Sequence, residues 1–205
     1  LYNGMDLSKI CQGPNPLAER YRGKRVVLGV GNLKRTKGFD LLIEATAQLA
    51  GRYPDLQTVI VGGGTELPRL QALVRQFDVG DRVEICGFRA PLETMAYMDA
   101  CEIFCLPSWL EGFGIVYLEA MAHGKPVIGV QGQGVERIVR EHQTGLLVPP
   151  RDADAVARAI ETLLGEPQRA QQMGHRGRQL VLQEFSWEKH AERLLTLYRD
   201  TLQQK

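Results

Sequence analysis

The chain has 205 residues, of which 44% are hydrophobic and 24% charged, and this composition is ordinary for a large globular domain with its own core. The 25 Lys and Arg residues are balanced by 24 Asp and Glu residues, so the net positive charge typical of a nucleic-acid-binding protein is absent. No apolar run is long enough to span a membrane, and the first ten residues lack the pattern of a signal peptide. We therefore expect a cytoplasmic protein that does not bind nucleic acid.

The first 22 residues carry several Gly and Pro residues and no hydrophobic period, which predicts an interdomain linker. Short apolar runs then alternate with amphipathic stretches. The runs predict strands at 25–30, 58–61, 83–86, 103–106, 127–130 and 145–148. The amphipathic stretches predict helices at 39–50, 66–77, 92–99 and 116–122, and the later sequence predicts helices at 153–164, 167–183 and 186–203.

Apolar strands that alternate with helices are typical of a parallel sheet covered on both faces. The predicted fold class is therefore α/β, a Rossmann-like doubly wound parallel sheet of about six strands with C-terminal helices. We divide the chain into a linker at 1–22, a ligand-binding domain at 23–165 and C-terminal helices at 166–205.

The four cysteines are expected to be structural thiols in a reducing compartment. Cys86 and Cys105 follow apolar runs, where free cysteine packs as a small hydrophobe. Cys101 lies four residues before Cys105, but no further Cys or His completes a zinc pattern, and Cys11 stands alone. We expect no bound metal.

Glycines and polar residues follow five of the predicted strands. They occupy 31–38, 62–66, 87–89, 107–114 and 131–134. The carboxyl ends of parallel strands share one edge of the sheet, which is where ligands bind in this class of fold. Backbone amides at glycines and at helix N-termini favour an anion, so a phosphate-bearing ligand is expected there.

Two of these segments have alternative interpretations. The triple glycine at 62–64 is either a tight turn or a ligand contact, and position 67 is Leu where a dinucleotide fingerprint needs a third Gly. A nicotinamide-dependent oxidoreductase is therefore disfavoured. The basic cluster at 34–37 is either a solvated loop or a phosphate contact.

Glu111 precedes a glycine-rich turn, and Glu119 lies in the apolar helix that follows it. A carboxylate is costly to bury unless it accepts hydrogen bonds, and sugar or ribose hydroxyls can donate them. The alternative for Glu119 is an exposed or ion-paired helix residue. His123, at the end of the same helix, is expected to be a cationic C-terminal cap rather than a catalytic base, and Ser186 is expected to cap the last predicted helix.

The spacing of Glu111 and Glu119 resembles the Glu-x7-Glu motif of the group 1 (family 4) retaining glycosyltransferases of GT-B fold. The segments at 120–128, 30–45 with Lys37-Gly38, 144–149 and 2–6 are also similar to that family. The resemblance covers residues 1–165 and implies a C-terminal, donor-binding domain. A preceding N-terminal domain would hold the acceptor and carry any contact with a membrane.

The resemblance implies a role for each matching residue. Lys37 and Glu111 would be catalytic, with Lys37 neutralising the diphosphate and Glu111 binding the donor sugar, while Glu119 would bind the ribose. The donor-binding set is Gly31, Asn32, Lys37, Gly87, Phe88, Glu111, Gly112, Phe113, Gly114, Ile115 and Glu119. The family needs no metal, the donor nucleotide sugar acts as substrate rather than cofactor, and UDP is a candidate carrier.

The sequence departs from the family pattern at two positions. Many members have Arg where this chain has Asn32, and Lys34 or Arg35 could replace that cation. The Gly-Gly-x-x-Glu pattern is altered before Glu136, which is either a site residue or a helix-start carboxylate. The expected function is retaining hexosyl transfer by a larger protein, with little turnover by this piece alone. The alternative is a non-catalytic nucleotide-binding or scaffold module.

Overall fold

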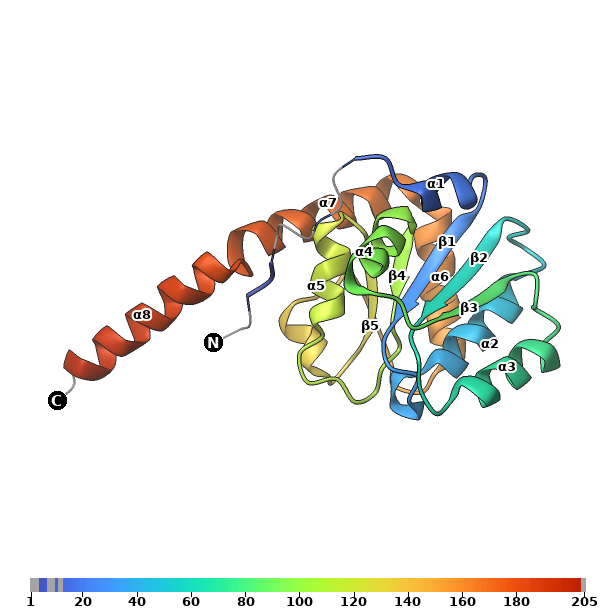
Figure 1. The fold of residues 1–205 in the computed structure, drawn as a ribbon, viewed down its shortest axis with the longest axis horizontal. Coiled ribbons are helices and arrows are strands. Elements are labelled where there is room, and N and C mark those ends of the chain that lie inside the picture. Colours follow the sequence, from blue (N-terminus) through green and yellow to red (C-terminus); the bar gives the residue numbers. More distant parts are fainter. Residues whose placement is uncertain (1–3, 7–9, 11–12, 204–205) are drawn as a thin grey trace.

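The computed structural model describes residues 4–6, 10 and 13–203. Six strands form one sheet in the order β3-β2-β1-β4-β5-β6, and every pairing is parallel (Figure 1). The strands are β1 (Arg25–Val30), β2 (Leu56–Val61), β3 (Val83–Gly87), β4 (Ile103–Cys105), β5 (Val127–Val130) and β6 (Gly145–Val148). The predicted α/β fold and its six strands are confirmed.

Eight helices flank or follow this sheet in the described part of the chain. They are α1 (Pro16–Arg20), α2 (Phe39–Leu49), α3 (Leu67–Gln76), α4 (Pro91–Ala100), α5 (Ile115–Ala122), α6 (Ala153–Gly165), α7 (Pro167–Glu184) and α8 (Trp187–Gln203), with short 3-10 turns η2 (Arg35–Lys37) and η3 (Gly134–Arg137). Helix α2 packs against α3 and α6, whereas α4 packs against α1 and α5, and α5 against α7. Successive residues of β1 and β2 are buried, so both faces of the sheet are covered.

The segment predicted as a linker contains helix α1. Asn15 caps it by accepting a hydrogen bond from the amide of Leu17, and Pro16 occupies its first position. The Asn15 amide also donates to the carbonyl of Ala96 (2.8 Å) and to Asp99 (2.9 Å), so this segment packs on α4. A five-residue helix is too short to show a period in the sequence. The role of residues 1–22 as an interdomain linker stays a prediction.

The C-terminal helices continue from the sheet domain and leave it. Helix α7 runs close to the end of α5, because a Cβ at Gly174 would lie 1.9 Å from the carbonyl oxygen of Gly124. Ser186 caps α8 through the amide of Lys189 (3.2 Å), as expected, and α8 then extends beyond the body of the domain (Figure 1). Large apolar side chains stay exposed on it: Leu195, Leu197, Tyr198 and Leu202. None of the described helices combines the length and apolar character needed to cross a bilayer.

The described cysteines are free thiols in or near the core. Cys101 and Cys105 are fully buried, and Cys86 is half-buried. Burial raises the pKa of Cys86 to about 11 and that of Cys101 to about 12, so both stay protonated and unreactive at neutral pH. Cys11 lies outside the described residues.

Candidate functional site

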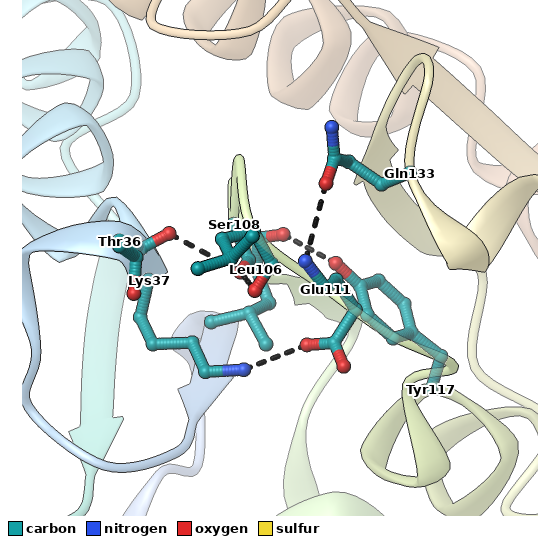
Figure 2. A network of polar contacts seen from close by, with 8 residues as sticks. Thr36, Lys37, Leu106, Ser108, Glu111, Tyr117 and Gln133 are labelled. Atoms are coloured by element: carbon teal, nitrogen blue, oxygen red, sulfur yellow. Dashed lines mark hydrogen bonds and ion pairs between the residues drawn. The ribbon is translucent and has the colours of Figure 1, made fainter.

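Two loops meet where the strand order reverses. Strands β1 and β4 are neighbours, but β1 leads to β2 on one side while β4 leads to β5 on the other. Lys37 ends η2 after β1, and Glu111 lies in the loop after β4. Their side chains form an ion pair with 2.7 Å between Nζ and Oε2 (Figure 2). The two side chains are 22% and 12% exposed, so the pair is largely shielded from water.

Glycine and backbone hydrogen bonds hold Lys37 in this position. Gly38 has a left-handed φ of 70°, and a Cβ there would lie 2.2 Å from the carbonyl oxygen of Pro107. The carbonyl of Thr36 accepts hydrogen bonds from the Trp109 amide (3.0 Å) and the Ser108 hydroxyl (3.2 Å; Figure 2). The loops after β1 and β4 are therefore joined independently of the ion pair.

Glu111 is held by contacts from the loop after β5, and α5 supports the loop that carries it. Its amide donates to Oε1 of Gln133 (3.2 Å), and its carbonyl accepts from the Gly134 amide (2.9 Å). Tyr117, fully buried in α5, donates its hydroxyl to the carbonyl of Leu106 beneath the same loop (Figure 2). Sequence reasoning missed the supporting roles of Gln133 and Tyr117. The glycine-rich context of Gln133 was the one available signal.

A cavity of about 260 Å³ opens beside this pair, at the carboxyl ends of β1, β2 and β3. It is lined by Val30, Gly31, Asn32, Val61, Gly62, Gly63, Phe88, Arg89, Pro91, Thr94, Met95 and Glu119. Four predicted site residues are among them: Gly31, Asn32, Phe88 and Glu119. Gly31 connects the cavity to the ion pair, because a Cβ there would lie 4.0 Å from Cδ of Lys37. The ion pair of Lys37 and Glu111 therefore adjoins the cavity that Glu119 lines, although neither residue of the pair is part of its lining. We call the cavity and the adjoining ion pair the crevice.

One end of the cavity offers a flat apolar surface. Phe88 is 76% exposed and faces Gly63, whose absent Cβ would lie 3.7 Å from that of Phe88. Gly87 has a φ of 72°, and its carbonyl accepts from the Gly62 amide (2.9 Å). Exposed aromatic rings are platforms on which planar groups stack.

The triple glycine is needed for close packing of two loops, and its contact with a ligand stays a prediction. A Cβ on Gly62 would lie 1.9 Å from the carbonyl oxygen of Gly31, and one on Gly64 would lie 2.6 Å from that of Leu33. These glycines let the loops after β1 and β2 pack closely. Gly62 and Gly63 also line the cavity.

The turn into α5 places backbone rather than side chains at the crevice. Gly114 adopts a φ of 87° before the helix, and Gly112 is exposed. The ring of Phe113 packs near that of Phe185, 6.2 Å between centroids, so its side chain is engaged with the C-terminal helices. Only its backbone is left for a ligand, as the expected role requires. The N-terminus of α5 adds a partial positive charge there.

A second, smaller hollow adjoins the cavity. Its volume is about 170 Å³, and it is lined by Gly4, Met5, Asp6, Met95, Ile115, Glu119 and Trp187. Met95 and Glu119 line both hollows. Glu119 therefore faces the cavity and also the place where the first described residues meet α8.

The surroundings of three further side chains bear on the alternatives that the sequence left open. Glu136 accepts a hydrogen bond from the Gly132 amide (2.8 Å), so it stabilises its own turn. Arg35 lines a separate hollow, away from Asn32. Arg89, which the sequence did not single out, supplies a guanidinium to the lining of the cavity.

His123 caps α5, as expected, but not as a cation. Its Nδ1 lies 2.8 Å from the carbonyl oxygen of Glu119. Burial is the main cause that lowers the pKa of His123 below its usual 6.5. The ring is therefore neutral at pH 7, and the expected interaction between a positive charge and the helix dipole is wrong.

The parallel sheet, with a glycine-lined cavity at the carboxyl ends of its strands, defines the chain as a Rossmann-like α/β domain. A profile of the family described as "Glycosyl transferases group 1" matches residues 18–180, and the chain belongs to this family. The predicted GT-B donor-domain resemblance is confirmed at this level.

Individual relatives agree with this assignment. The chain is 35% identical over 206 residues to a GDP-mannose-dependent alpha-(1-6)-phosphatidylinositol monomannoside mannosyltransferase of Mycolicibacterium smegmatis, covering 95% of this chain and 54% of the relative. It superposes on sucrose-phosphate synthase of Thermosynechococcus elongatus with a TM-score of 0.87 and 34% identity, covering 99% of this chain and 52% of that one. It is also similar to Anabaena HepE in complex with UDP and glucose, with a TM-score of 0.87, 26% identity, and coverage of 96% and 55%. The chain thus spans about half the length of these proteins.

Proposed function

We propose that the crevice binds a nucleoside diphosphate sugar, and that the protein containing this domain transfers the hexosyl group with retention. The observation that supports this proposal is that the Lys37–Glu111 ion pair adjoins a cavity lined by Glu119 and by glycines at the strand ends. The acceptor would be held by a preceding N-terminal domain, so this chain alone would bind donor with little turnover.

Each part of the donor has a matching part of the crevice. The diphosphate lies against Lys37 and the amides of residues 112–115, which supply positive charge as the leaving group forms. Glu111 accepts hydrogen bonds from the sugar, and Glu119 from the ribose. The base stacks near Phe88. This division of the charge between a lysine and a helix N-terminus leads us to propose that no divalent metal is required.

The nucleotide and the compartment are finer parts of the proposal. HepE was crystallised with UDP, which makes UDP the first nucleotide to test. The described cysteines are free thiols, which suits the reducing environment of the cytoplasm.

Isothermal titration calorimetry of the 205-residue chain with UDP, GDP and ADP tests donor binding. We expect one of the three to bind, and Glu119→Ala to weaken that binding about tenfold or more, because it removes charge-assisted hydrogen bonds. Glu192→Ala, a substitution on exposed α8, is the matched control and should change nothing. If none of the nucleotides binds the unaltered chain, the proposal is wrong.

A further inference from the structure

A second hollow lies at the same edge of the sheet but belongs to different loops. Its volume is about 440 Å³, and its lining residues are Arg35, Thr36, Asp40, Leu41, Trp109 and Arg151. They come from the segments after β1, β4 and β6 and from the start of α2. None of these residues lines the cavity that contains Glu119. We call this hollow the arginine hollow.

The charge in the arginine hollow is positive and uncompensated. Arg35 and Arg151 are both exposed, and no carboxylate of the described residues lies within ion-pair distance of either. The one acid in the lining, Asp40, is already paired with Arg69, with 2.9 Å between Oδ2 and Nη2. Two guanidinium groups therefore face the hollow with their charge available to a ligand.

Arg151 is held in an unusual conformation. Its φ is 59°, a left-handed value that glycine adopts freely and a long side chain rarely does. Its guanidinium lies over the indole of Trp109, 5.1 Å from the ring centroid. The Trp109 backbone is itself fixed by the carbonyl of Thr36 (3.0 Å). Because the face of the guanidinium stacks on the indole, the N–H groups at its edge can donate hydrogen bonds to a ligand. The side chain is already ordered by this contact, so binding would cost less conformational entropy.

We propose that the arginine hollow binds a phosphomonoester group carried by a ligand other than the donor nucleotide. Two cations, one of them held by stacking on Trp109, match the near-double negative charge of a phosphomonoester, and guanidinium groups bind its oxygens in a bidentate manner. The left-handed backbone of Arg151 is energetically unfavourable, and such residues cluster at sites where the side chain binds a ligand. The feature of the ligand that we infer is this phosphate group, which free inorganic phosphate also presents.

Tryptophan fluorescence can report on this hollow directly. The chain has two Trp and six Tyr residues, so Trp187→Phe leaves Trp109 as the single tryptophan, which is excited selectively at wavelengths that tyrosine does not absorb. We expect titration of this variant with inorganic phosphate, and separately with glycerol 3-phosphate, to give a saturable change at constant ionic strength. Tighter binding of glycerol 3-phosphate would indicate an ester ligand, and equal binding would indicate the free anion as ligand.

Arg151→Gly is the decisive variant because glycine suits a φ of 59°, so the fold is preserved while the guanidinium is lost. In the Trp187→Phe background, Arg151→Gly and Arg35→Ala should each weaken phosphate binding about tenfold. Lys34→Ala, an exposed neighbour that does not line the hollow, is the matched control.

The affinity for UDP should be the same with and without Arg151→Gly, which separates this site from the proposed donor site. The proposal is overturned if phosphate gives no saturable signal, if sodium chloride at equal ionic strength gives the same signal, or if Lys34→Ala weakens binding as much as Arg151→Gly.

Discussion

Lys37 and Glu111 form an ion pair across the boundary where the strand order reverses, with 2.7 Å between Nζ and Oε2. Each side chain compensates the charge of the other in a setting that is mostly closed to water. A diphosphate that enters the crevice would therefore meet a lysine that is already ordered.

Lys37→Ala is expected to lower both stability and nucleotide affinity. Removing the lysine leaves the Glu111 carboxylate without an ion-pair partner in a position that is largely shielded from water. We expect this to lower the free energy of unfolding, measured by urea denaturation, by about 1–3 kcal/mol. The double variant Lys37→Ala/Glu111→Gln should recover most of that stability without recovering nucleotide binding. Equal stability of the single and double variants would show that the pair does not shield a charge.

Two neighbouring glycines should respond in opposite ways. Gly62→Ala places a Cβ 1.9 Å from the carbonyl oxygen of Gly31, so we expect a loss of about 3 kcal/mol or more, or failure to fold. Gly63→Ala meets only Cβ of Phe88 at 3.7 Å and should fold with nearly unchanged thermal stability. Because Gly63 lines the cavity beside Phe88, the same variant should bind nucleotide more weakly by calorimetry. If Gly63→Ala binds the nucleotide with unchanged affinity, the proposed position of the nucleotide base at this end of the cavity is wrong.

Arg89 is expected to supply the positive charge that Asn32 lacks. Arg89 lines the cavity that Glu119 also lines, and its guanidinium donates a hydrogen bond to the carbonyl of Phe88 (3.1 Å). A hydrogen bond with the hydroxyl of Tyr97 is the main cause that raises the pKa of Arg89. Arg89→Ala should weaken nucleotide diphosphate binding about tenfold, and Asn32→Arg should restore it in the Arg89→Ala background. Arg75→Ala, on exposed α3, is the control. An Arg89→Ala variant with full affinity would contradict this assignment.

Stability should fall as the pH drops below neutrality because of His123. Its pKa is lowered in the folded state by burial, so below pH 6.5 the unfolded chain takes up a proton that the folded chain resists. The contribution of His123 to the free energy of unfolding is fully present above pH 6.5. As the pH falls from 6.5 to the pKa of the folded state, this contribution decreases by up to about 1.4 kcal/mol per pH unit. Urea denaturation at pH 7.5, 6.5 and 5.5 measures it.

His123→Gln should flatten this dependence, whereas His175→Gln, at an exposed position, should leave it intact. A pH profile that is identical in His123→Gln and the unaltered chain would assign the loss to other groups.

The sheet and the main site residues could be predicted from the sequence for a clear physical reason. Strands buried on both faces are continuous apolar runs, and the polar residues that follow them must share one edge. The roles of Glu111 and Glu119 came from the resemblance of their spacing to a family motif, and those roles stay a prediction. These signals are local, so one chain is sufficient to read them.

The remaining features depend on contacts between distant loops, which no local pattern encodes. The Gln133 side chain accepts a hydrogen bond from the backbone amide of Glu111, which lies 22 residues earlier in the chain. Arg89 reaches the cavity because β3 ends beside β2. The expected charge on His123 was wrong because burial, which is a tertiary property, outweighs the helix dipole. Helix α1 was missed because its stability comes from α4 rather than from its own five residues.

The chain enters and leaves the sheet domain at one place. Met5 forms a parallel bridge with Ser186, and its amide donates to the carbonyl of Phe185 (2.7 Å). Any body joined to either end would therefore pivot about this bridge, and a tilt of α8 would displace Trp187 and the Gly4–Asp6 segment together. Both line the small hollow that Glu119 shares, so the tilt would alter the room around that carboxylate.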